Sequence, residues 1–111
     1  MTVLATATID GHEARGRARL IHAADGTATI EVIDFWVAPG APDVRLFISP
    51  DPSGTVDDSA IDLGPVPEGP ATITRPIPSH VDPASLGSII VYCKIYSVLF
   101  GYGTLAPRAT P

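Results

Sequence analysis

Apolar and polar side chains alternate with a period of two along most of the chain, and this pattern limits the fold more than any other feature. In the segment TATIEVIDF, Thr27–Phe35, the apolar residues Ala28, Ile30 and Val32 fall on one face. Successive side chains of a β-strand point to opposite faces, so such a segment buries one face and hydrates the other. No stretch of ten or more residues shows the period of a helix. The pattern therefore predicts an all-β protein.

Turn-forming residues divide this pattern into short strands. The dipeptide Asp25-Gly26 predicts a tight hairpin turn, and DPASLG, 82–87, predicts one helical turn capped by Asp82 with Pro83 first in the helix. About seven to nine strands in two packed antiparallel sheets, a β-sandwich, are expected. The expected strands are Thr2–Ile9, Gly16–His22, Thr27–Phe35, Val44–Ser49, a short edge segment Ile61–Leu63, Ala71–Arg75, and Ser88–Leu105 as one long strand or as two that bend near Gly101 and Gly103.

Length and charge exclude several classes of protein. A chain of 111 residues predicts a single domain, 1–111. The net charge of -5 argues against binding to nucleic acid or to anionic lipid, which needs a basic surface. The longest apolar run is too short to span a bilayer, and the N-terminus lacks the pattern of an export signal. We expect a soluble protein without membrane insertion, cytoplasmic as the chain stands, although a mature exported form would look the same.

The chain has one cysteine, Cys93, and therefore cannot form an internal disulfide. Strand alternation places Ile89, Val91, Cys93 and Ile95 on one face, and the neighbouring Lys94 marks the other face as the wetter one. Cys93 is thus expected to point inward among aliphatic side chains. Such surroundings favour the neutral thiol, which is a poor nucleophile, and are typical of a cysteine that only fills space.

The sequence gives only weak evidence for any other metal, catalytic or ligand-binding site. The three histidines could join Cys93 in a copper or zinc site, but nothing after Cys93 is His or Met, as a cupredoxin-type loop would require, and no metal site is expected. No serine has a base that the sequence places beside it, so an enzyme is the less favoured interpretation. Seven aromatic residues could stack sugars or line a pocket, although most are explained as core: Phe35, Trp36, Phe47, Tyr92, Tyr96, Phe100 and Tyr102.

The C-terminal block IIVYCKIYSVLFGYGTL, 89–105, resembles the signature of the DM-thirteen domain family. That signature runs as an apolar strand, Trp/Tyr-Cys, an aromatic residue, and then x-Val-x-Phe-Gly-x-Ala-x-Leu. The likeness covers about residues 11–105, with Tyr96 where Phe is common and Gly103 where Ala is. Other segments fit in order: His12, GRARL from Gly16, GTATI from Gly26, VIDF 32–35, DVRLFIS 43–49, DLG 62–64 and the region from Ile77 to Asp82.

The resemblance implies a β-sandwich with a role in electron transfer and with Cys93 as its redox centre. Tyr92 and Tyr96 would then be neighbouring aromatics that relay electrons or border a cofactor, and the partner would be a redox protein. Members of the family often occur on exported proteins, sometimes beside haem-binding DOMON domains. The residues leave open the alternative of a non-enzymatic ligand- or protein-binding module in which Cys93 only packs the core. Neither interpretation names a cofactor or an oligomeric state.

Overall fold

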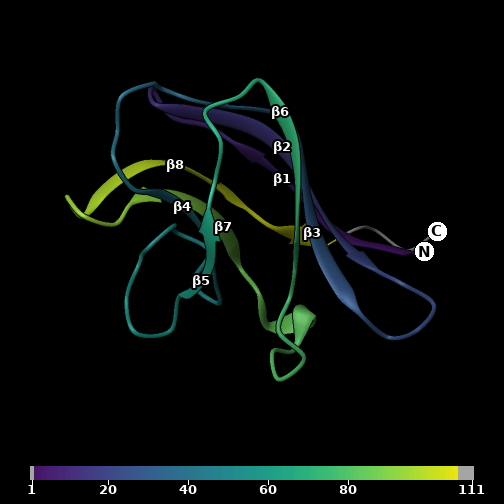
Figure 1. The fold of residues 1–111 in the computed structure, drawn as a ribbon. Coiled ribbons are helices and arrows are strands. Elements are labelled where there is room, and N and C mark those ends of the chain that lie inside the picture. The colour runs from purple at the N-terminus through teal and green to yellow at the C-terminus, as the bar shows by residue number, and fades with distance from the viewer. Residues whose placement is uncertain (1, 108–111) are drawn as a thin grey trace.

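Two antiparallel sheets face each other and enclose the core (Figure 1). The structure, a computed structural model, describes residues 2–107. Within these residues the strand order is β6-β3-β2-β1-β9 in the five-stranded sheet and β5-β4-β7-β8 in the four-stranded sheet. The predicted all-β sandwich is confirmed. Its elements are β1 (Thr2–Ile9), β2 (Ala14–His22), β3 (Ala28–Val37), β4 (Val44–Ser49), β5 (Ile61–Pro65), β6 (Ala71–Pro76), the 3₁₀ turn η1 (Pro83–Ser85), β7 (Ser88–Cys93), β8 (Val98–Thr104) and β9 (Ala106–Pro107).

Both local turn predictions are confirmed. The backbone between β2 and β3 reverses around Gly26, whose φ is +92°, and the Asp25 carboxylate accepts hydrogen bonds from the Thr27 backbone N–H and hydroxyl. In η1 the Asp82 side chain accepts from the Ala84 N–H at 3.0 Å, as an N-cap should. None of the elements within residues 2–107 is a helix long and apolar enough to cross a membrane.

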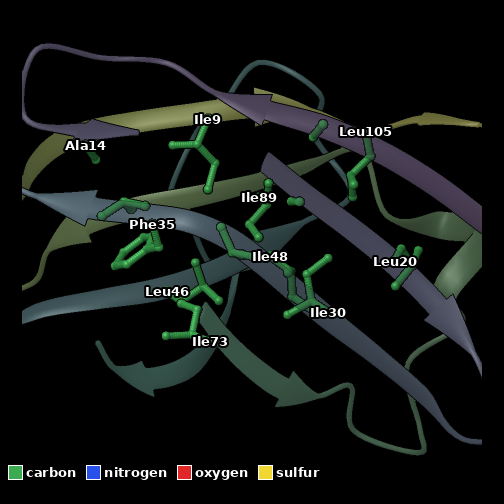
Figure 2. Packing of buried hydrophobic residues seen from close by; sticks show 14 of the residues in the cluster. Ile9, Ala14, Leu20, Ile30, Phe35, Leu46, Ile48, Ile73, Ile89 and Leu105 are labelled. Carbon is green, nitrogen blue, oxygen red and sulfur yellow. The ribbon is translucent and has the colours of Figure 1, made fainter. Parts of the chain in front are cut away.

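The core lies between the sheets and is built from branched aliphatic side chains, several alanines and one fully buried phenyl ring (Figure 2). Complete burial of one such side chain stabilises a fold by about 1.5–3 kcal/mol, so this cluster supplies the main driving force for folding. Both sheets contribute to it. The labelled members are Ile9, Ala14, Leu20, Ile30, Phe35, Leu46, Ile48, Ile73, Ile89 and Leu105.

A bulge in β3 reverses which of its residues face the core. Asp34 has a left-handed backbone conformation, with a φ of 52°, and the register of β3 shifts there against both β2 and β6. An extra residue of this kind resets the alternation of side chains along a strand. Phe35 is thereby buried completely, and Trp36 is directed to the outer face of the sheet. Simple alternation from Ile30 and Val32 would have given the opposite result.

The prediction for the C-terminal block is wrong in one respect. The chain does form two strands, but it reverses at residues 94–97 and not near the two glycines. Ile95, expected on the inner face, is 62% exposed because β7 ends at Cys93. Gly101 and Gly103 instead lie inside β8, where the backbone of the N-terminal segment approaches closely. A Cβ at Gly103 would lie 2.5 Å from the carbonyl oxygen of Thr8.

The same close approach links the two sheets along one edge. Asp10 and Tyr102 exchange backbone hydrogen bonds, from the Asp10 N–H at 3.2 Å and from the Tyr102 N–H at 3.4 Å. Gly11 follows at once, and its small size is required because an added Cβ would lie 2.2 Å from the Phe100 carbonyl oxygen. The end of β1 thus covers part of the free edge of β8, which limits pairing with other chains.

A second, smaller apolar layer covers the outer face of the four-stranded sheet. Ile90 lies on this face yet is completely buried, since its register partners are Phe47 and Tyr102. Gly54, in the loop 50–60, packs onto the Tyr102 ring, and the Ser88 hydroxyl donates to the Asp51 carbonyl at 2.6 Å. The loop 50–60 therefore shields part of the sheet, and β7 is buried on both faces.

The contact between Gly54 and Tyr102 makes a testable prediction about stability. Gly54 has a φ of +75°, and an added Cβ would lie 2.4 Å from the ring carbon Cγ. Gly54→Ala should therefore lower the free energy of unfolding by about 2–4 kcal/mol, through backbone strain and overpacking together. Gly26→Ala, at a φ of +92° with open space around it, should cost only about 1–2 kcal/mol. Equal costs in urea unfolding would contradict this account of the loop.

The loop 50–60 also predicts sensitivity to acid. Hydrogen bonds from the Ser53 hydroxyl and backbone N–H hold the pKa of Asp51 below its ordinary value of 3.8. Because the folded-state pKa is the lower one, the stabilising contribution is present above about pH 4 and is lost as pH falls through the folded pKa. Asp51→Asn should therefore reduce the loss of stability between neutral and strongly acidic solution. Parallel curves of unfolding free energy against pH for the two proteins would contradict it.

Candidate functional site

Cys93 is the last residue of β7, and its side chain is completely buried. Its register partners are Val44 on β4 and Val98 on β8. Ile89 and Val91, on the same face of the strand, are equally buried and belong to the core. The predicted inward orientation of the thiol is confirmed. In this conformation the sulfur makes no contact with solvent, so no reagent reaches it without a movement of the chain.

The reversal that follows Cys93 is the most apolar exposed segment among residues 2–107. We call residues 94–99 the β7–β8 tip. Ile95 and Tyr96 are 62% and 66% exposed, and both Val98 and Leu99 are 45% exposed. The sequence did not reveal this surface, because continuing the strand through residue 95 assigned its side chain to the core. Neighbouring apolar residues displayed together are a common property of binding surfaces.

The structure does not gather the two predicted tyrosines around the thiol. Tyr92 lies on the opposite face of β7 from Cys93, half-buried, with its ring edge against Phe47 at a centroid distance of 5.6 Å. Tyr96 is in the β7–β8 tip and points into solvent to a large degree. Both tyrosines are close to Cys93 along the chain, but neither lies beside the thiol on the inner face of the sheet.

A chain of ion pairs borders the same end of the four-stranded sheet. Arg45 donates to Asp43 at 2.9 Å and to Asp62 at 3.2 Å, and the Lys94 ammonium lies 3.5 Å from the Asp62 carboxylate. The hydrogen bond that Arg45 donates to Asp43 raises the pKa of Arg45 above its already high ordinary value. The Lys94 N–H also donates to the Asp43 carbonyl at 2.9 Å. These contacts tie the first residue of the tip to the start of β4.

No metal centre accompanies the thiol in the part of the chain that the structure describes. Within residues 2–107, no three side chains of His, Cys, Asp or Glu lie close enough together to hold a metal ion. His12 lies in the turn after β1, His22 ends β2 and His80 lies between β6 and η1. The sulfur of Cys93 can itself form a mixed disulfide or a sulfenic acid once it is exposed.

Comparison with known proteins identifies the family. A family model with the description "Electron transfer DM13" matches residues 7–105. A search of curated proteins and a search of solved structures find no match. The matched range runs from β1 to the residue after β8 and includes Cys93 and the whole β7–β8 tip. The chain, a two-sheet β-sandwich over nearly its whole length, belongs to the DM13 family, a family described by electron transfer.

Proposed function

We propose that this domain is an electron-transfer module whose redox group is Cys93 and that the thiol reacts only when the β7–β8 tip opens. The observation that carries the proposal is the position of Cys93, which is the last strand residue before an exposed apolar turn. The family description supports electron transfer as the general role. Cys93 carries the only side-chain sulfur among the described residues, since the only methionine is Met1.

The geometry of the tip supports local opening. Its internal hydrogen bond, from the Ser97 N–H to the Lys94 carbonyl, is long at 3.4 Å. Ser97 has a φ of 54°, a left-handed conformation that costs a non-glycine residue about 1 kcal/mol or more. Few apolar contacts hold the exposed residues that follow Lys94. Segments with these properties open more readily than the core that surrounds them.

The proposed reaction is thiol–disulfide exchange with a partner protein. In the opened form the Cys93 thiolate attacks one sulfur of a disulfide in the partner. A bond forms between Cys93 Sγ and that sulfur, the partner's S–S bond breaks, and its second sulfur leaves as a thiolate. An external resolving thiol of a dithiol donor then attacks Cys93 Sγ, a bond forms between the two sulfurs, and the partner's first sulfur leaves as a thiolate. The donor's other thiol attacks the donor sulfur of this new mixed disulfide, which forms the donor's own disulfide and releases the Cys93 thiolate. The partner is reduced by two electrons and the donor is oxidised by two. A domain with one cysteine needs this external resolving thiol, because it cannot form a disulfide within itself.

Thiol titration with a chromogenic aromatic disulfide tests the gating. The folded protein should react at least about 100-fold more slowly than the protein in denaturant, since opening must come first. Reaction should nevertheless proceed in the absence of denaturant, at a rate that depends little on low denaturant concentrations. A thiol that reacts only where circular dichroism reports global unfolding would contradict the proposal.

A pair of variants separates opening of the tip from global unfolding. Ser97→Val places a β-branched residue at a positive φ and should speed the reaction of the native thiol by about tenfold. Gly26→Ala strains a hairpin turn between β2 and β3, in the other sheet, at a φ of +92°. It should leave the reaction rate within about twofold of the unmodified protein. Equal acceleration by both variants would show that the thiol is reached only through global unfolding.

The complete burial of the sulfur favours a second candidate function, a binding module in which Cys93 is only core packing. Both candidates require the thiol to stabilise the closed fold. Cys93→Ser should therefore lower the free energy of unfolding by about 1–3 kcal/mol, because a hydroxyl is harder to desolvate than a thiol. Thermal melting measures this, and an unchanged melting temperature would contradict the burial itself. Persistent failure of the native thiol to react would leave the binding module as the better candidate.

A further inference from the structure

The outer face of the five-stranded sheet carries a shallow hollow of about 610 Å³, whereas the shielded face over Ile90 belongs to the four-stranded sheet. Strands β1, β2 and β3 form its floor. Its lining includes Asp10, Arg15, Arg17, Asp34 and Trp36. Pro70, just before β6, adds an apolar wall. A concave site that combines an aromatic ring with a few directed polar groups is the usual form of a small-molecule site.

The bulge in β3 is what brings the indole to this hollow. Without the left-handed residue at Asp34, alternation would bury Trp36 and expose Phe35. Bulges of this kind recur next to functional sites, where they redirect one side chain. The same residue supplies the carboxylate that pairs with Arg17 at 2.7 Å. One unusual backbone conformation thus places two of the groups that line the hollow.

Arg15 differs from the other two arginines that point outward from β2. Arg17 pairs with Asp34, and Arg19 pairs with Glu31, each with an N–O distance of 2.7 Å. The Arg15 guanidinium stacks over the Trp36 ring, 4.6 Å from the ring centroid. Among residues 2–107 it has no carboxylate partner within salt-bridge distance. Arg15 also lines the hollow, and within residues 2–107 no hydrogen bond from its guanidinium to another residue is present.

We propose that this hollow binds a small carboxylate carried on a ring-shaped body. The Arg15 guanidinium donates two parallel hydrogen bonds to the carboxylate, the geometry for which a planar guanidinium is best suited. Trp36 and Pro70 contact the ring, and stacking on the indole holds the guanidinium in place. The Arg17–Asp34 pair is neutral as a unit, and Asp10, the other acidic residue of the lining, is balanced in formal charge by Arg15, so the hollow carries no net negative charge that would repel the anion. This site is independent of the role proposed for Cys93 and lies on the other sheet.

Trp36 is the only tryptophan in the chain, and its fluorescence reports directly on the hollow. The protein is titrated with galacturonate and with benzoate, each matched by its uncharged counterpart, galactose or benzamide. We expect a saturable change in emission for at least one acid and binding at least about tenfold weaker for its counterpart. Response to galacturonate assigns a sugar acid, and response to benzoate assigns an aromatic acid. No saturable response to either acid, or equal responses to the uncharged compounds, overturns the proposal.

Variants on β2 locate the binding. Arg15→Gln should weaken binding of the responding acid by about tenfold or more, because it removes a charge-assisted pair of hydrogen bonds. Arg15→Lys should weaken it as well, since an ammonium cannot form the two parallel bonds. Arg19→Gln is the matched control, on the same face of β2 but outside the lining of this hollow. Unchanged affinity in Arg15→Gln, or equal losses in Arg15→Gln and Arg19→Gln, would overturn the assignment.

Discussion

The burial of β7 on both faces is the constraint on which the rest of this sandwich depends. The strand lies between β4 and β8, with the inter-sheet core on one side and the layer of Phe47 and Tyr102 on the other. A strand covered on both faces has an almost continuous apolar sequence, as SIIV at the start of β7 does. It anchors its neighbours in register and carries Cys93 to the point where this cover ends.

Under the proposed function, this arrangement lets a single thiol be both structural and chemically active. Within β7 the sulfur fills space and is withheld from solvent, and one residue later the chain enters an exposed turn. Chemistry at such a position is governed by the free energy of opening rather than by the intrinsic reactivity of the thiol. The ion pairs from Arg45 and Lys94 to Asp62 then set how firmly the base of that turn is held.

Alternation and turn residues were sufficient to predict the fold class, most strands, the Asp82 cap and the inward orientation of Cys93. These features depend on the local sequence and on which face of a strand is buried. The alternation of apolar and polar residues with a period of two indicates that face directly. The reversal at residues 94–97 was not predictable in the same way, because KIYS lacks glycine, proline and aspartate. Lys94 marked the face of β7 that carries Ile90 as the wetter one, yet Ile90 is completely buried there. Its neighbours on that face are Phe47 and Tyr102, and the Tyr102 ring packs against a loop that starts forty residues before Ile90 in the sequence.

The candidate sites were harder to predict than the fold, because they depend on tertiary contacts between residues that are distant in the sequence. Nothing in the sequence around Arg15 shows that a guanidinium will stack on an indole more than twenty residues away. The pairing of β2 with β3 creates that contact, and the shift in register at Asp34 decides which aromatic ring takes part. Sequence alternation alone assigns Phe35 and Trp36 to the wrong sides.

The backbone conformation of Asp34 has a wider meaning for how this domain can diverge. One added residue in β3 decides which of the adjacent rings of Phe35 and Trp36 is buried in the core and which lies on the outer face of the sheet. Relatives that gain or lose that position would display a different chemistry on the same scaffold, with the interior still filled by an aromatic side chain. Insertions and deletions at this point, more than substitutions, would therefore generate new surface properties in such a sandwich.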